Sequence, residues 1–176
     1  MKVRNRPRCS KPDLTRRSPA ELITWLDQCQ SFPLKAAAAF SNDADIGEQT
    51  HINVTSFNNV ALMTGEAPTA DLRERAELIV AGIENVRQVY NEIIIAAPSS
   101  LGSRSTDTWI TTKAKSAILG SDQLEAWDTT RIKVVTERGV VYLMGLVSRQ
   151  EAEAATETIR RVGGVQRVVR LFEYTD

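Results

Sequence analysis

The sequence predicts an α+β fold of two small tandem αββαβ domains, each with a three-stranded mixed sheet covered by two helices on one face. Three observations lead to this class. A segment recurs after about eighty residues, each copy contains two apolar runs joined by a two-residue turn, and each copy continues into an amphipathic helix and a last apolar run. With 176 residues, the chain can form two domains near the lower size limit for a self-sufficient core.

The repeat is visible in apolar and glycine positions that recur at constant spacing. The spacing is eighty residues for the pairs Ile52/Ile132, Val54/Val134, Val60/Val140 and Gly65/Gly145. After a one-residue deletion it is seventy-nine for Ala76/Ala155, Val86/Val165 and Val89/Val168. One unit has therefore been duplicated.

Each copy is predicted to contain a β-hairpin. "HINVTSF" and "RIKVVTE" are the first strands, "NN" and "RG" are tight turns, and "VALMTG" and "VVYLMG" are the return strands. We expect Gly65 and Gly145 to end these return strands and to determine the fold rather than bind a ligand. The reason is either that a side chain there would crowd the next helix against the sheet or that a special backbone angle is needed. The last strands, 86–95 and 165–174, are expected to return parallel to the strand before the helix.

Helices are predicted from caps and apolar stripes. Ser148 and Glu151 have the spacing of a capping box. "DTWITTKAKSAIL" predicts a helix before the second hairpin, with Asp107 as its N-cap and Gly120 as its C-terminal stop. The expected buried stripes are Leu72, Ala76, Ile79 and Ile83 in the first copy, Ala152, Ala155, Ile159 and Val162 in the second, and Ile110, Ala114, Ala117 and Ile118 in the helix before it.

These elements give a domain plan with four parts. Residues 1–33 form an atypical leader, 34–97 the first domain and 107–176 the second domain. Residues 98–106 are expected to be a linker, because this stretch is rich in Ser and Gly.

The composition excludes several classes of protein. No stretch approaches the eighteen or so apolar residues that are needed to span a bilayer. Two cysteines, Cys9 and Cys29, can build neither a disulfide framework nor a four-ligand metal site, and we expect no metal and no cofactor. The net charge of zero hides a segregation of charge: residues 34–97 have nine acidic side chains against four basic ones, whereas residues 104–176 have ten acidic against eleven basic.

The leader does not have the pattern of a secretory signal. Residues 1–17 contain seven basic side chains and one acidic one but no apolar run, and "RPR" precedes Cys9 where a lipobox is apolar. We therefore expect neither cysteine to be a lipid anchor. A wrongly set start and a divergent leader both explain this segment. "SPAELITWLDQCQ" within it predicts a helix, whereas Pro33 is expected to interrupt the first helix of the first copy.

The repeated unit resembles the BON domain family. The resemblance rests on "INVTSFNNVALMTGEAP", "VYNEI", "DTWITTK" and "VYLMGLV" in this order, and covers residues 34–176. The order of the two domains is similar to that of dual-BON lipoproteins of Gram-negative bacteria associated with division and outer-membrane stress. The resemblance implies a non-enzymatic protein at the periplasmic face of the outer membrane, which binds anionic phospholipid, supports envelope integrity and has envelope proteins as further partners.

The helix that begins near Asp107 is the expected lipid-binding element. Tryptophan prefers the headgroup level of a bilayer, and a basic residue near an anionic surface contributes about 1 kcal/mol. Trp109, Lys113 and Ser116 share one helix face, and the family implicates the matching helix and its Trp in phospholipid contact. The lipid-binding residues are therefore predicted to be Trp109, Thr112, Lys113, Lys115 and Ser116.

Two alternatives stay open for individual residues. Trp109 either contacts lipid or packs against the first domain or the edge of the core. Basic side chains at Arg160 with Arg161, and at Arg167 with Arg170, either assist lipid binding or form solvated faces of a helix and a strand.

Other functions are weighed against lipid binding. The single histidine, His51, corresponds to Arg131 in the second copy, and no nucleophile elbow, phosphate loop or zinc-protease motif is present, so we expect no enzyme. Nucleic-acid binding is not expected, because a KH-type GXXG loop and stacking aromatics are missing. The serious alternative is a protein-binding or chaperone-like stress role, in which a basic partner meets acidic residues of the first domain: Asp43, Asp45, Glu48, Asp71 and Glu74.

Overall fold

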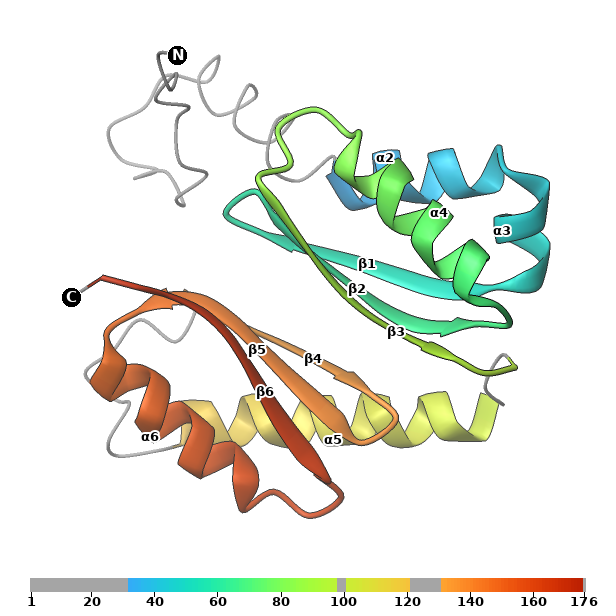
Figure 1. The fold of residues 1–176 in the computed structure, drawn as a ribbon. Coiled ribbons are helices and arrows are strands. Elements are labelled where there is room, and N and C mark those ends of the chain that lie inside the picture. The colour runs from blue at the N-terminus through green and yellow to red at the C-terminus, as the bar shows by residue number, and fades with distance from the viewer. Residues whose placement is uncertain (1–31, 98–100, 121–130, 176) are drawn as a thin grey trace, which may run out of the picture. The chain divides into compact units, whose positions relative to one another are not determined.

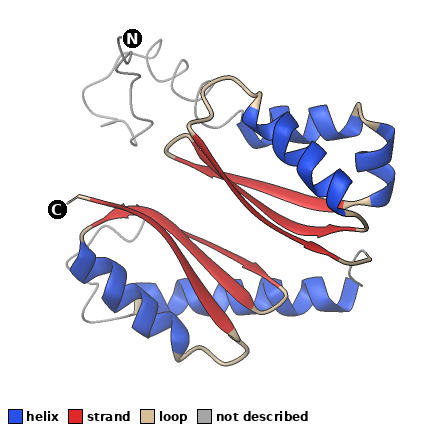
Figure 2. Ribbon diagram, viewed as in Figure 1, coloured by secondary structure: helices blue, strands red, loops and turns tan. Residues whose placement is uncertain are grey.

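Two α+β units make up the chain, one within residues 1–98 and the other within residues 99–176, and we call them domain 1 and domain 2. The computed structural model describes residues 32–97, 101–120 and 131–175. In each domain, three strands form one mixed sheet and the helices cover one face of it (Figures 1 and 2). The predicted fold class is confirmed.

Domain 1 has a central strand with one antiparallel and one parallel neighbour. Its elements are α2 (Phe32–Ser41), α3 (Ala44–Gln49), β1 (His51–Phe57), β2 (Val60–Ala67), α4 (Ala70–Ala81) and β3 (Gln88–Ile95). β2 pairs antiparallel with β1 and parallel with β3. The parallel return after α4 is the predicted crossover.

Domain 2 repeats this plan with one helix in place of α2 and α3. Its elements are α5 (Leu101–Leu119), β4 (Ile132–Glu137), β5 (Val140–Val147), α6 (Arg149–Arg160) and β6 (Arg167–Tyr174). β5 is the central strand, antiparallel to β4 and parallel to β6. The register matches domain 1, because Val140 lies opposite Arg167 as Val60 lies opposite Gln88.

Each domain has its own apolar core between the sheet and the helices. In domain 1 it is built around Ala36, Met63, Ala76, Val80 and Ile93. In domain 2 it is built around Ile110, Ala114, Ile118, Leu143 and Ile159. These sets contain members of each predicted helical stripe, so the 3.6-residue periodicity identified the buried helix faces.

The hairpin turns and the capping box of α6 form as their residues predict. Asn58 and Asn59 have φ of 48° and 65°, and Arg138 and Gly139 have φ of 52° and 74°, which are the angles of two-residue type I′ turns. The capping box of Ser148 with Glu151 is present at the start of α6.

Two glycines lie inside strands, so the prediction that they end them is wrong. Gly65 and Gly145 are each two residues before the last residue of β2 and β5. A Cβ on Gly65 would lie 1.9 Å from the carbonyl oxygen of His51, and a Cβ on Gly145 would lie 2.6 Å from that of Arg131. The crowding that requires glycine therefore comes from the backbone just before the paired strand residue and not from the following helix. The expected special backbone angle is present at Gly65, with a φ of +118°, but not at Gly145.

The first helical position of domain 1 is filled by two short helices. α2 begins at Phe32, so Phe32 and Pro33 belong to domain 1 although the sequence assigned them to the leader. Pro33 does not interrupt this helix, because it lies in the first turn, where its missing N–H has no intrahelical partner to lose. A new helix starts after Asp43, whose carboxylate accepts a hydrogen bond from the Ile46 N–H. The helix predicted at 18–30 and both cysteines lie outside the described residues.

We expect Gly65→Ala to destabilise the protein by about 3 kcal/mol or more in urea unfolding, because Gly65 combines the close contact with a φ of +118°. Gly145→Ala should also be destabilising, but less so, because its φ is not positive. Gly163→Ala is the matched control, since a Cβ there meets no atom within 4 Å, and it should stay within about 0.5 kcal/mol of wild type. An equal loss of unfolding free energy in all three variants would contradict the steric explanation.

Candidate functional site

The predicted lipid-binding helix is longer than expected and is fixed by a buried acid. α5 begins at Leu101, so residues 101–106 are helical and are not part of a linker. Asp107 is consequently not an N-cap, but lies in the second turn with only 7% of its surface exposed. Its two carboxylate oxygens accept hydrogen bonds from the backbone N–H groups of Arg138 and Gly139, each at 2.8 Å. The predicted Asp107 N-cap is therefore wrong, and so is the predicted linker over residues 101–106, while residues 98–100 lie outside the described residues.

This contact ties α5 to the β4–β5 turn. Both central residues of the turn direct their N–H groups to the same carboxylate, and such charge-assisted hydrogen bonds are about twice as strong as neutral ones. The face of α5 that carries Asp107 is therefore held on domain 2, and the opposite face is directed to solvent.

The exposed face of α5 contains no acidic side chain among residues 105–120. Ile110, Ala114 and Ile118 are buried against the sheet. The exposed positions are Ser105, Thr106, Thr108, Trp109, Thr112, Lys113, Lys115, Ser116, Leu119 and Gly120. The outward face of this helix is therefore neutral or basic, with two large apolar side chains.

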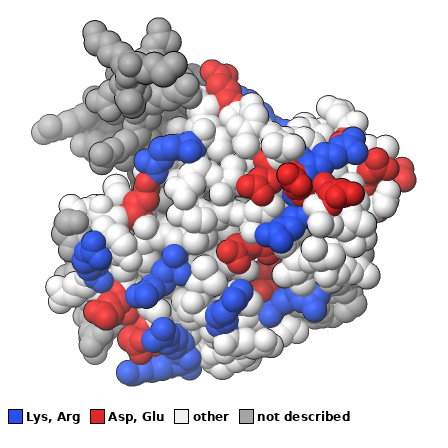
Figure 3. All heavy atoms as spheres, in the orientation of Figure 1, with Lys and Arg blue, Asp and Glu red and all other residues white. Residues whose placement is uncertain are grey.

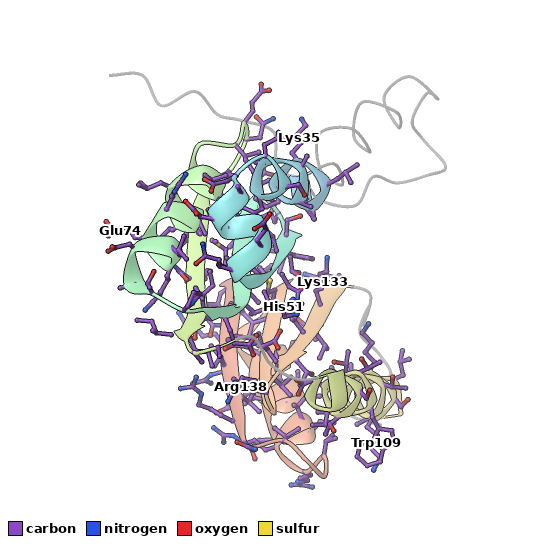
Figure 4. All side chains as sticks on the ribbon, turned by 90° about the vertical axis from the view of Figure 1, so that its right-hand side faces the viewer. Lys35, His51, Glu74, Trp109, Lys133 and Arg138 are labelled. Atoms are coloured by element: carbon purple, nitrogen blue, oxygen red, sulfur yellow. The ribbon has the colours of Figure 1, made fainter. Side chains whose placement is uncertain are left out.

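Trp109 and Lys113 form the most distinctive feature of this face. Trp109 is 54% exposed and lies on the side of α5 that faces away from the domain 2 sheet (Figure 4). The Lys113 ammonium lies 3.5 Å from the centroid of the Trp109 ring, which is a close cation–π contact. Trp109 is not one of the residues of the domain 2 core.

The other predicted residues lie around this pair in different ways. The Thr112 hydroxyl donates a hydrogen bond to the Thr108 carbonyl at 3.0 Å, and Ser116 is exposed one turn further on. Lys115 lies on the other flank of the helix and approaches Lys133 of β4. Burial of the Lys133 ammonium lowers the pKa of Lys133, and the nearby charge of Lys115 lowers it further. The helix thus brings together four of the predicted residues, while Lys115 stands apart.

Leu119 belongs to the same stripe and was not predicted. It is 66% exposed and continues the series Trp109, Thr112, Ser116 at helical spacing of three and four residues. That spacing was the signal that could have identified it. An exposed indole and an exposed isobutyl group therefore lie along one line of α5, near the two ends of the stripe.

The acidic residues of the alternative function lie on the helices of domain 1. Figure 3 shows acidic side chains gathered over α4 in the face that it displays. Arg75 of α4 reaches Asp43 at 2.7 Å and Asp45 at 3.2 Å, so two of the five predicted acids are paired within the domain. Glu48, Asp71 and Glu74 are exposed.

Residues with potential catalytic or metal chemistry do not gather in the described ranges. His51 begins β1, with its Nε2 3.5 Å from the Asn53 side-chain nitrogen. Within residues 32–97, 101–120 and 131–175, no three His, Cys, Asp or Glu side chains are placed to hold a metal ion. None of the helices in these ranges is both long and apolar enough to cross a bilayer.

The fold and this surface define a class of tandem-repeat α+β proteins, and similarity to known proteins gives the family. The BON domain family matches residues 35–97 and 106–176, and the chain belongs to this family. The "21 kDa hemolysin" of Actinobacillus pleuropneumoniae is 39% identical over 140 residues, which cover 80% of this chain and 71% of that protein.

Two further relatives have names that refer to the bacterial envelope or to osmotic stress. "Outer membrane lipoprotein DolP" of Haemophilus influenzae is 32% identical over 147 residues, covering 84% of this chain and 75% of that protein. "Osmotically-inducible protein Y" of Escherichia coli is 29% identical over 129 residues, covering 72% and 63% of the two chains.

We expect Asp107→Ala to destabilise domain 2 by roughly 2–4 kcal/mol, because two backbone N–H groups lose a charged acceptor. Asp107→Asn retains one acceptor oxygen and should therefore destabilise domain 2 less than Asp107→Ala does. Urea unfolding checks both variants, with Glu153→Ala on the exposed surface of α6 as a control that stays within about 0.5 kcal/mol of wild type. If Asp107→Ala were as stable as Glu153→Ala, the carboxylate would not hold the turn.

Proposed function

We propose that this protein is a non-enzymatic envelope protein that binds anionic phospholipid membranes through the outward face of α5. The observation that carries the proposal is the Trp109–Lys113 pair. A half-exposed indole has an ammonium 3.5 Å from its ring, on a helix face without acidic side chains. The helix lies in the plane of the interface and does not cross the bilayer.

The two groups of the pair match the two layers of a membrane interface. Tryptophan is enriched at the headgroup level, where its ring meets acyl chains and its N–H meets polar groups. A lysine stem extends along the apolar layer while its ammonium stays at the level of the phosphates. Leu119 adds a second apolar contact along the same stripe, and Thr112 and Ser116 occupy the polar level between them. Binding is therefore expected to be reversible, with an apolar part and a salt-sensitive part.

Charge favours domain 2 as the side that meets the membrane. The first domain has nine acidic against four basic side chains over residues 34–97 and would be repelled by anionic lipid. A relative named as an outer membrane lipoprotein supports a location at the periplasmic face of the outer membrane, with envelope integrity as the role and envelope proteins as additional partners.

The second candidate function is binding of a basic protein by domain 1. The exposed acids Glu48, Asp71 and Glu74 favour it, although Arg75 already neutralises part of the acidic surface. This role is compatible with lipid binding, because the two surfaces belong to different domains.

Vesicle flotation of the full chain tests the proposal. Wild type is expected to float with vesicles of phosphatidylcholine and phosphatidylglycerol in equal amounts, and less so at high salt or with phosphatidylcholine alone. Trp109→Glu should weaken binding roughly tenfold or more, because it removes the indole and adds a charge that the membrane repels. Leu78→Glu is the matched control, since Leu78 is also an exposed apolar residue, on α4 of domain 1, and it should bind as wild type does.

Equal flotation of wild type and Trp109→Glu would remove Trp109 from the membrane contact. No flotation of wild type with anionic vesicles would overturn the proposal and favour the protein-binding role of domain 1.

Lys113→Gln separates the electrostatic part of the contact. It should weaken flotation with the anionic vesicles about fivefold and reduce the dependence on salt, because it removes one cation at the phosphate level. Binding to phosphatidylcholine alone should not change. An equal loss of binding to the anionic vesicles and to vesicles of phosphatidylcholine alone would indicate that Lys113 acts only by orienting the Trp109 ring.

A further inference from the structure

We infer that domain 2 meets the anionic membrane with a second, basic surface beside α5, which rests on the proposed function and extends the same site. This surface lies at the end of the domain where the β4–β5 turn, the end of α6 and the start of β6 come together. We call it the arginine rim, and it consists of Arg138, Arg160, Arg161 and Arg167.

The three segments of the rim are held together by backbone contacts. The Gln166 N–H donates a hydrogen bond to the Gly139 carbonyl at 2.9 Å, and Arg167 lies opposite Val140 in the parallel ladder. Arg161 caps the C-terminus of α6 with its own N–H bonded to the last turn. The arginines therefore belong to one end of the domain 2 sheet.

The rim borders the flank of α5 that carries Lys113. A Cβ on Gly164 would lie 3.0 Å from the Ile110 side chain, so the loop between α6 and β6 packs against α5 at Ile110. Ile110 and Lys113 are three residues apart on the helix and are therefore neighbours on its surface. Asp107 holds the other part of the rim, because it binds the N–H groups of Arg138 and Gly139. Lys113 on α5 and the rim arginines on the neighbouring segments thus form one continuous basic surface.

The rim charges are accessible to an external anion. All four arginines are exposed. Arg160 pairs with Glu157 at 2.5 Å, whereas no carboxylate within the described residues forms an ion pair with Arg161 or Arg167. A Cβ on Gly163 would meet no atom within 4 Å, so the loop between α6 and β6 has open space around this position. Arg161 and Arg167 can therefore approach a flat layer of phosphates.

The duplicated domain shows that the fold does not need these arginines. The corresponding residues of domain 1 are Asn58, Ala81, Gly82 and Gln88, and none is charged. The hairpin turn has the same backbone conformation in both copies: Asn58 has φ 48° and Arg138 has φ 52°. The Arg87 N–H bonds the Asn59 carbonyl at 2.8 Å, as the Gln166 N–H bonds the Gly139 carbonyl at 2.9 Å. Four basic residues at structurally neutral positions of one copy therefore point to an external partner.

A membrane surface fits this arrangement better than a soluble polyanion does. The basic rim adjoins an exposed indole at Trp109, and an apolar anchor beside cations matches an interface in which acyl chains underlie phosphates. The partner class is therefore anionic phospholipid in a bilayer, and guanidinium groups of the rim bind its phosphates.

The experiment replaces rim arginines with the residues that domain 1 has in their place. In the full chain, Arg138→Asn, Arg161→Gly and Arg167→Gln are combined, and flotation is measured with vesicles of phosphatidylcholine and phosphatidylglycerol in equal amounts. Binding should weaken by about fivefold for each arginine and roughly a hundredfold in the triple variant, with a shallower salt dependence. Arg170→Gln is the control, because Arg170 is an exposed arginine on β6 outside the rim, and its binding should equal that of wild type.

The outcomes separate this inference from the proposed function. If the triple variant floats like wild type while Trp109→Glu does not float, the rim takes no part and the α5 contact alone stands. If Arg170→Gln weakens vesicle binding as much as the single variant Arg161→Gln does, only the total charge of the domain matters. The inference that the rim is a binding site is then wrong. If wild type does not float, the proposed function and the rim both fall. Urea unfolding of the triple variant accompanies the test, and if it is destabilised, Arg161→Gln against Arg170→Gln decides the result.

Discussion

The contact between the Asp107 carboxylate and the β4–β5 turn is the interaction on which the functional surface depends. It satisfies two backbone N–H groups of a type I′ turn and fixes which side of α5 faces the sheet. Because side chains on a helix are set relative to one another, fixing one face also fixes the opposite face. Together with the buried stripe of Ile110, Ala114 and Ile118, this acid therefore directs Trp109 and Lys113 outward, and it also holds the Arg138 turn against α5.

The duplication separates what the scaffold requires from what the surface adds. Both copies need glycine at the same position of the central strand, because the neighbouring backbone carbonyl approaches too closely for a Cβ. Both also use a two-residue turn with positive φ at each central residue. The surfaces then differ: domain 1 carries acids around α4, partly paired with Arg75, whereas domain 2 carries an exposed indole and basic side chains. One fold thus supports two electrostatically different surfaces.

Prediction from the sequence failed where a local signal competed with a tertiary contact. Asp107 has the residue type and position of an N-cap, but its carboxylate bonds a turn thirty-one residues further along the chain, and the helix starts earlier. Pro33 has the residue type of a helix breaker, but it lies in a first turn, where proline is compatible with a helix. Leu119 was not predicted although it continues the helical spacing of Trp109, Thr112 and Ser116, because its 66% exposure is shown only by the structure.

The sequence by itself determined the repeat, the order of helices and strands, the hairpin turns, the capping box and the buried helix stripes, because each depends on residues close together in the chain or on a period of two or 3.6. It also identified the helix with Trp109 and Lys113. Only the tertiary structure decided where that helix begins, why Gly65 and Gly145 must be glycine, and that Arg138, Arg161 and Arg167 share one end of domain 2. The physical reason is that these features arise from backbone hydrogen bonds and close approaches between segments that are distant in the sequence.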